Sequence, residues 1–213
     1  CEERLSPGET AALQRFAREH ELTMSTLVHA AWVIVQARYN GGGEVVAGMT
    51  MSGRPATLPG AESMVGLFIN TLPVRVEVDE ASDLITWLQQ LQEHTARARE
   101  FDYTPLTKIH EWSEVPGQLP LFHSIVVFEN YPVGDGLVQE IEGLRIGEFT
   151  SFEQTNYPLN LISGTGAVTG LVNVTGPVTR LPLKLLYDGA RIDAAAARRL
   201  LGHVRTVLSG FAA

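Results

Sequence analysis

The spacing of the apolar residues changes along the chain, and the order of these changes limits the fold more than any other feature. Residues 7–40 carry apolar side chains at helical spacing, residues 72–78 alternate apolar and polar, and residues 200–208 return to helical spacing. Strand and helix patterns between them lack the regular alternation of a Rossmann or barrel fold. The order predicts an α/β domain with a two-layer mixed sheet and helices, and no linker divides residues 1–213.

Local signals set the expected elements. Ser6-Pro7-Gly8-Glu9 forms a capping box with Pro at the first helical position. Further helices are expected from a cap at Thr23 or Ser25, from a cap at Ser82 to about Glu100, over residues 106–112 and from a cap at Asp193. Strands or hairpin-like stretches are expected at residues 44–52, 72–78, 122–128, 137–149, 158–163, 167–174 and 181–187. Residues 62–70 are mixed and fit at most one short helix.

Composition excludes several classes of protein. Sixteen Lys and Arg against 24 Asp and Glu give a net charge of −8, which argues against nucleic-acid binding. Cys1 is the single cysteine, so the chain cannot form an internal disulfide or a cysteine-ligated zinc site. No apolar run reaches the roughly 18–20 residues that span a bilayer, and the N-terminus lacks a signal-peptide pattern. We therefore expect no membrane partner and a cytoplasmic protein, and the missing initiator Met suggests a piece of a longer chain.

The chemistry-bearing residues do not form a complete catalytic set. None of the six histidines stands in a metal-binding motif, and His29 on an apolar helical face is expected to be a hydrogen-bonded core residue. His123 and Ser124 are neighbours on an expected strand, so their side chains should point to opposite faces. Asp102 and Glu111 are candidate carboxylates, but nothing in the sequence pairs them. The sequence predicts no catalytic residue and no metal site.

One stretch carries a family resemblance. Residues 62–75 read ESMVGLFINTLPVR, which resembles the (I/V)GxFxNTxxxR motif of condensation domains from nonribosomal peptide synthetases. Other motifs of that family are matched in the same order by residues 53–55, 101–106, 120–132, 155–159 and 185–188. The resemblance covers essentially the whole chain.

The resemblance implies half of a larger catalytic domain. Condensation domains consist of two halves, each similar to half of a chloramphenicol acetyltransferase-like fold. In the tunnel between them, an acceptor aminoacyl amine attacks a donor thioester, and both substrates arrive on phosphopantetheine arms of carrier proteins. The family's HHxxxDG motif lies in the N-terminal half, and no two adjacent histidines occur here. This chain thus resembles the C-terminal half, which should be inactive alone and should bind no cofactor itself. Implied partners are the N-terminal subdomain, donor and acceptor peptidyl carrier proteins, and an adjacent adenylation domain.

Six residues are candidates for the tunnel wall or for the interface with the other half. They are Gly66, Asn70, Thr71, Arg75, Asn156 and Tyr157. Gly66 would permit close backbone approach, and Asn70 and Thr71 could bond the pantetheine arm or the facing half. The alternative for each is a structural role, with Gly66 as a packing glycine and Asn70 as a residue that stabilises the fold. Arg75, among valines, is expected to be buried and to need a partner. It is either a residue of the tunnel wall or part of an ion pair that stabilises the fold.

Two segments, residues 53–62 and 130–157, are candidates to reach across to the other half, as a floor loop and a crossover latch do in the family. We also expect an exposed apolar face where that half would lie. An alternative function is a condensation-like interaction module that recruits tailoring enzymes or carrier proteins. An epimerisation domain shares the fold but fits residues 70–75 less well. The sequence does not define the donor, the acceptor or the product.

Overall fold

A mixed six-stranded sheet forms one layer of the molecule. The computed structural model describes residues 1–54, 58–129, 155–164 and 179–213. The sheet order is β1-β6-β5-β4-β2-β3, with β2–β4 and β4–β5 parallel and the other neighbours antiparallel. The strands are β1 (Glu2–Arg4), β2 (Glu44–Met51), β3 (Asn70–Glu77), β4 (Ser124–Glu129), β5 (Leu159–Gly164) and β6 (Pro182–Tyr187). This confirms the predicted mixed sheet.

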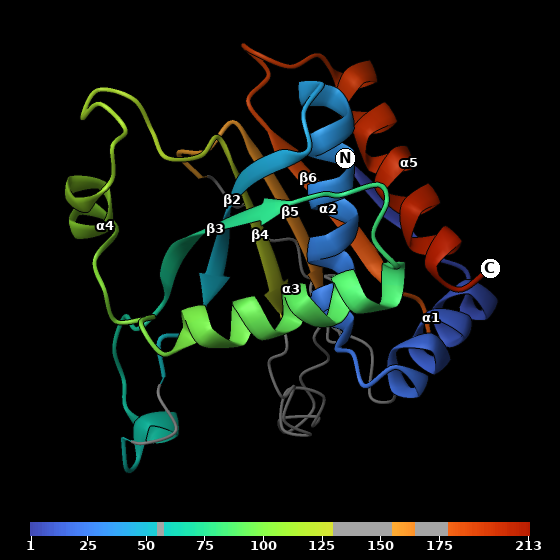
Figure 1. The fold of residues 1–213 in the computed structure, drawn as a ribbon, viewed down its shortest axis with the longest axis horizontal. Coiled ribbons are helices and arrows are strands. Elements are labelled where there is room, and N and C mark those ends of the chain that lie inside the picture. Colours follow the sequence, from blue (N-terminus) through green and yellow to red (C-terminus); the bar gives the residue numbers. More distant parts are fainter. Residues whose placement is uncertain (55–57, 130–154, 165–178) are drawn as a thin grey trace, which may run out of the picture.

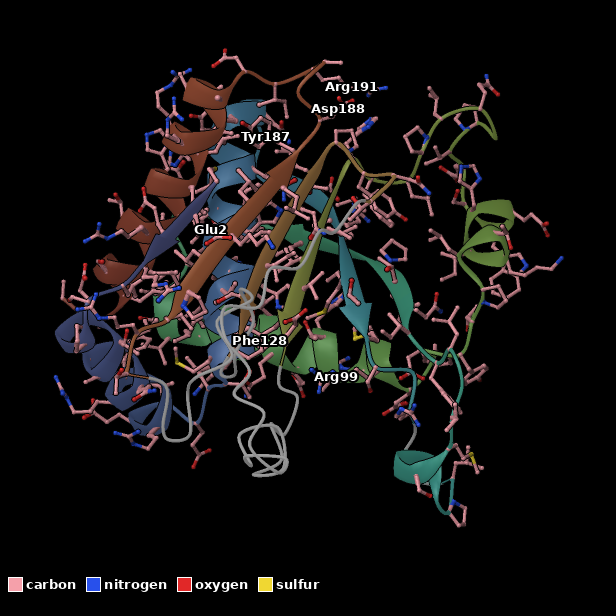
Figure 2. All side chains as sticks on the ribbon, turned by 180° about the vertical axis from the view of Figure 1, so that it is seen from behind. Glu2, Arg99, Phe128, Tyr187, Asp188 and Arg191 are labelled. Carbon is pink, nitrogen blue, oxygen red and sulfur yellow. The ribbon has the colours of Figure 1, made fainter. Side chains whose placement is uncertain are left out.

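Helices cover one face of this sheet. Four of them, α1, α2, α3 and α5, lie on the near side in Figure 1, whereas α4 lies beyond β3. The helices are α1 (Pro7–Glu19), α2 (Met24–Asn40), α3 (Leu84–Arg99), α4 (Leu106–Trp112) and α5 (Ala194–Phe211), with a 3-10 turn η1 (Ala61–Ser63). Figure 2 shows the opposite face of the sheet, and no helix of the described residues lies in front of it. The two-layer architecture is therefore as predicted.

The helix ends follow the predicted capping chemistry with one correction. Ser6 and Glu9 form the complete capping box, and this hydrogen bonding lowers the pKa of Glu9 to about 2. Thr23 caps α2, and Gly41 ends it in the left-handed conformation. Asp83, not Ser82, caps α3, because its carboxylate accepts from both the backbone N and the hydroxyl of Thr86.

The apolar core of the molecule is centred on α2. Ten of its seventeen residues are buried. The sheet covers one side of this helix, and two other helices, α3 and α5, pack on other sides. Trp32 is fully buried and donates its indole N–H to the hydroxyl of Ser124 at 3.2 Å. That hydroxyl donates in turn to Gln36 at 3.1 Å, so the first residue of β4 is tied to α2.

The remaining predictions divide between the described and undescribed parts. Residues 137–149 and 167–174, which we predicted as strand-like, lie outside the described residues. The mixed segment contains η1 and then runs without regular structure to β3, which begins earlier than predicted, at Asn70. The predicted strands at 158–163 and 181–187 become β5 and β6, which pair antiparallel.

Candidate functional site

The motif segment between η1 and β3 places apolar side chains in solvent. Val65 and Leu67 are fully or almost fully exposed, at 104% and 91%, and Met64 and Ile69 are also exposed. Large apolar side chains gathered on one exposed segment are typical of an interaction surface. We call residues 64–69 the apolar segment. The predicted exposure of apolar surface is confirmed for these residues.

Asn70 anchors the end of this segment inside the chain. Its side-chain amide donates both protons, to the backbone carbonyls of Asp102 at 2.8 Å and Thr104 at 2.7 Å. Its carbonyl oxygen accepts from the backbone N of Thr71 at 2.9 Å. The amide group is fully used in holding the turn after α3, where Phe101 and Tyr103 are exposed. Asn70 therefore acts structurally here, and joins two exposed apolar stretches.

Replacing Asn70 with aspartate is expected to lower the free energy of unfolding by about 2 kcal/mol. The carboxylate keeps the size of the amide but would face two carbonyl oxygens that lose their donor. Urea unfolding followed by circular dichroism measures the loss. Asn156→Asp, at an exposed position, is the matched control and should leave stability unchanged. Equal stability of both variants would show that the hydrogen bonds from the Asn70 amide contribute nothing to the free energy of unfolding.

Arg75 is not buried, which corrects the sequence prediction. Its side chain is 74% exposed and forms an ion pair with Glu44 on the neighbouring strand. The reason is the alternation of β3: Leu72, Val74 and Val76 face the helices, so the residue between two buried valines must point the other way. The predicted partner exists, but it is a surface ion pair.

Arg75→Ala should change the free energy of unfolding by less than about 1 kcal/mol, because exposed ion pairs are weak. The small difference should shrink further when the unfolding is repeated in high salt, which screens exposed charges. A loss above about 2 kcal/mol would contradict the exposed geometry.

Gly66 and Thr71 lie in the same stretch of the chain as Asn70. Gly66 is exposed within the apolar segment, and a Cβ there would meet only the ring of Phe68, at 3.2 Å. Thr71 is half-buried opposite Thr50 in the β2–β3 ladder. Gly66 therefore lies within the apolar segment, and Thr71 follows it by two positions.

Asn156 and Tyr157 lie elsewhere, in an open hollow of about 780 Å³. The hollow adjoins the start of β4 and of β5 and the end of β6, where Figure 2 places Tyr187, Asp188 and Arg191. Tyr157 stacks on Phe122, with ring centroids 5.2 Å apart, and burial raises the pKa of its phenol. The six predicted residues thus fall into two places, the apolar segment with β3 and this hollow.

His123 and Ser124 have different environments, as predicted. His123 is exposed and lines the hollow, whereas Ser124 is buried and committed to Trp32 and Gln36. The two candidate carboxylates also differ, since Asp102 is buried and Glu111 pairs with Lys108 at 2.7 Å on exposed α4. No catalytic pair emerges from these residues.

His29 is a core residue, but only one of its ring nitrogens is bonded. Its Nδ1 lies 2.8 Å from the carbonyl oxygen of Ser25, and its Nε2 is buried without a hydrogen-bond partner among the described residues. Burial lowers the pKa of His29 to about 4. The predicted core position of His29 is confirmed, and the predicted hydrogen bonding is found for one of its two ring nitrogens.

Neither a metal cluster nor a membrane span occurs in the described part of the chain. No group of three or more histidine, cysteine or acidic side chains within residues 1–54, 58–129, 155–164 and 179–213 could hold a metal ion. In the same ranges, no helix combines the length and the apolar character needed to cross a membrane.

Sequence reasoning missed Arg54, which contacts the loop around the apolar segment at three points. Its side chain donates to the backbone carbonyls of Ala61 and Met64, and its guanidinium lies over the ring of Phe68. The available signal was the GRP stretch at residues 53–55, which the family motif includes.

Comparison with known proteins gives a consistent set of relatives. The family model described as Condensation domain matches residues 2–213. One of the proteins that make up linear gramicidin synthase in Brevibacillus parabrevis is 41% identical over 210 residues, which is 99% of this chain and 3% of that protein. Another protein of the same synthase is 46% identical over 204 residues, 96% of this chain and 4% of that protein. The chain spans only a few per cent of these relatives.

Solved structures share the fold over about half their length. The X-domain from teicoplanin biosynthesis superposes with a TM-score of 0.81 at 24% identity, covering all of this chain and 46% of that chain. A complex of the X-domain and OxyB from teicoplanin biosynthesis gives 0.78 at 24% identity and covers all of this chain and 45% of that chain. The first condensation domain of the CDA synthetase gives 0.70 at 17% identity, covering all of this chain and 43% of that chain.

Proposed function

This chain belongs to the condensation-domain family, and from that premise we propose that it is the C-terminal half of a condensation domain in a nonribosomal peptide synthetase. It forms one wall of the tunnel in which an acceptor amine attacks a donor thioester to make an amide bond. Alone it is inactive, because the catalytic histidine belongs to the other half.

The exposed apolar segment carries this proposal. Val65 and Leu67 are held in solvent by a chain that buries a large apolar core elsewhere, so a partner surface is expected to cover them. Two further observations support the assignment to one half. The solved relatives are more than twice as long as the part this chain matches, and no two adjacent histidines occur in the sequence.

The candidate residues then have different tasks. Gly66 and Thr71, beside the apolar segment, are proposed to line the contact with the N-terminal half. Asn156 and Tyr157, in the hollow, are proposed to meet a substrate arm, since a neutral phenol and an amide suit the amide groups of phosphopantetheine. The phosphopantetheine belongs to donor and acceptor peptidyl carrier proteins, and an adenylation domain is expected beside the chain.

Analytical ultracentrifugation of the chain with a separate N-terminal half carrying HHxxxDG tests the proposal. We expect a one-to-one complex, with hydrophobic-dye binding by the chain lost as the complex forms. Leu67→Asp should weaken the complex, because it places a charge in the apolar contact while leaving the exposed position free of strain. Phe101→Asp tests whether the neighbouring turn takes part. Absence of any complex would contradict the proposed half-domain.

A second function is favoured by one comparison. The X-domain complex with OxyB has the same fold at a TM-score of 0.78 and is, by its name, an assembly with another protein. A condensation-like module that recruits a tailoring enzyme or a carrier protein without catalysis is therefore the alternative. The motif of the N-terminal half distinguishes the two, because an intact HHxxxDG favours catalysis and its loss favours recruitment.

A further inference from the structure

The loop that leads to the apolar segment is organised around Arg54. One nitrogen of its guanidinium, Nη1, donates to the carbonyl oxygens of Ala61 and Met64, the latter at 3.0 Å. The guanidinium carbon lies 4.3 Å from the centroid of the Phe68 ring, which is a cation–π contact. Arg54 thus contacts the loop before the apolar segment, its first residue and its fifth.

Gly53 fixes the same arrangement through the backbone. Its φ of +62° is in the left-handed region, and a Cβ at this position would lie 1.7 Å from the carbonyl oxygen of Phe68. Only glycine allows this approach. Two consecutive residues therefore lie against Phe68: the Gly53 backbone approaches its carbonyl oxygen, and the Arg54 guanidinium lies over its ring.

These contacts order a surface rather than the core. Arg54 is half-buried, yet its side chain contacts two loop carbonyls and one ring, all within residues 61–68. The contacted residues Met64 and Phe68 enclose Val65 and Leu67, which lie in solvent. Ordering an exposed apolar segment before binding removes part of the entropy that docking would otherwise cost.

We propose that Arg54 is a positioning residue that preorders the apolar segment for insertion into an apolar recess of the N-terminal half. The inference rests on the proposed function and adds to it the residue that sets the affinity of the two halves. The occupant follows from length, because this chain accounts for 43–46% of the solved condensation and X-domain chains, so the fold there continues in a second half. Arg54 does not touch the reacting groups; it acts through residues 64–69.

Limited proteolysis of the chain tests the ordering directly. Arg54→Ala should speed chymotryptic cleavage after Leu67 or Phe68 about tenfold, because the segment opens more often, while the thermal midpoint stays within about 1 °C. Arg54→Lys keeps a cation over the ring and one donor group, so it should restore part of the protection. Arg38→Ala is the matched control, since Arg38 is an exposed arginine of α2 that pairs with Glu80, outside the loop that Arg54 contacts. An unchanged cleavage rate in Arg54→Ala would overturn the proposal.

Binding to the separate N-terminal half tests the consequence. We expect Arg54→Ala to raise the dissociation constant about tenfold, Arg54→Lys to give an intermediate value, and Arg38→Ala to match the unmodified chain. Equal affinity of Arg54→Ala and the unmodified chain would overturn the positioning role while leaving the proposed function intact. If the unmodified chain itself does not bind, the proposed function fails and the docking role with it, and proteolysis still decides whether Arg54 orders the segment.

Discussion

Trp32→Ala is expected to lower the free energy of unfolding by about 3–5 kcal/mol, the largest loss we expect from a single substitution in this chain. Trp32 is fully buried on the central helix α2, so alanine would leave a cavity between α2 and the sheet. The change also removes the indole donor from Ser124, whose hydroxyl joins β4 to α2. Thermal and urea unfolding, followed by far-ultraviolet circular dichroism, measure the loss.

The chain supplies its own control for this prediction. Trp112 is 74% exposed at the end of α4, so Trp112→Ala should leave the unfolding midpoint almost unchanged. Trp32→Phe helps to separate the two contributions, because it keeps a large aromatic ring but removes the N–H donor and part of the indole; about 1–2 kcal/mol should be lost. A Trp32→Ala protein as stable as Trp112→Ala would contradict the packing described for α2.

Acidification is expected to lower the stability by about 3 kcal/mol through His29 alone. The pKa of His29 is lowered by burial from 6.5 to about 4, with nearby Arg99 acting in the same direction. The unfolded chain therefore takes up a proton at His29 below pH 6.5, while the folded chain does so only near pH 4. The contribution of the neutral imidazole is fully present above pH 6.5 and is lost as the pH falls towards 4.

A proton on the folded His29 ring would meet no opposite charge in the small cavity beside it. Its lining is otherwise uncharged: Val33, Ala47, Gly48, Met49, Val74, Val76, Leu91 and Thr95. Urea unfolding between about pH 7 and 4.5 keeps the contribution of Glu9 out of the measurement, because the stability that Glu9 gains from its pKa of about 2 is lost only below its unfolded pKa of 4.5. Glutamine does not titrate, so His29→Gln should flatten the pH dependence of the free energy of unfolding in this window. The same slope in both proteins would assign the effect to other groups.

The sequence predicted the elements well because local chemistry decides them. The capping box at Ser6, the strand alternation of residues 72–78 and the helix at 106–112 all depend on neighbours a few positions apart. Ser82 failed as a cap for a similarly local reason, since Asp83 offers a stronger acceptor one position later. Instead, Ser82 donates to Asp79 at 2.8 Å.

The site was less predictable because its contacts join distant residues. The sequence left open whether Asn70 is a tunnel residue or a structural one, because its partners lie more than thirty positions away, at Asp102 and Thr104. Arg75 was misjudged from its valine neighbours, although the alternation that buries those valines also exposes the residue between them. Arg54 belongs to a stretch that the motif included, but no pattern in the sequence indicates that its guanidinium contacts Ala61, Met64 and Phe68.

The central claim is that this chain is one half of a condensation domain, and amide formation tests it most directly. Carrier proteins loaded with donor and acceptor are incubated with the chain alone, with the HHxxxDG half alone, and with both, and product is followed by mass spectrometry. We expect amide product from the mixture only. Product from the chain alone, or none from associated halves with competent carriers, would contradict the account.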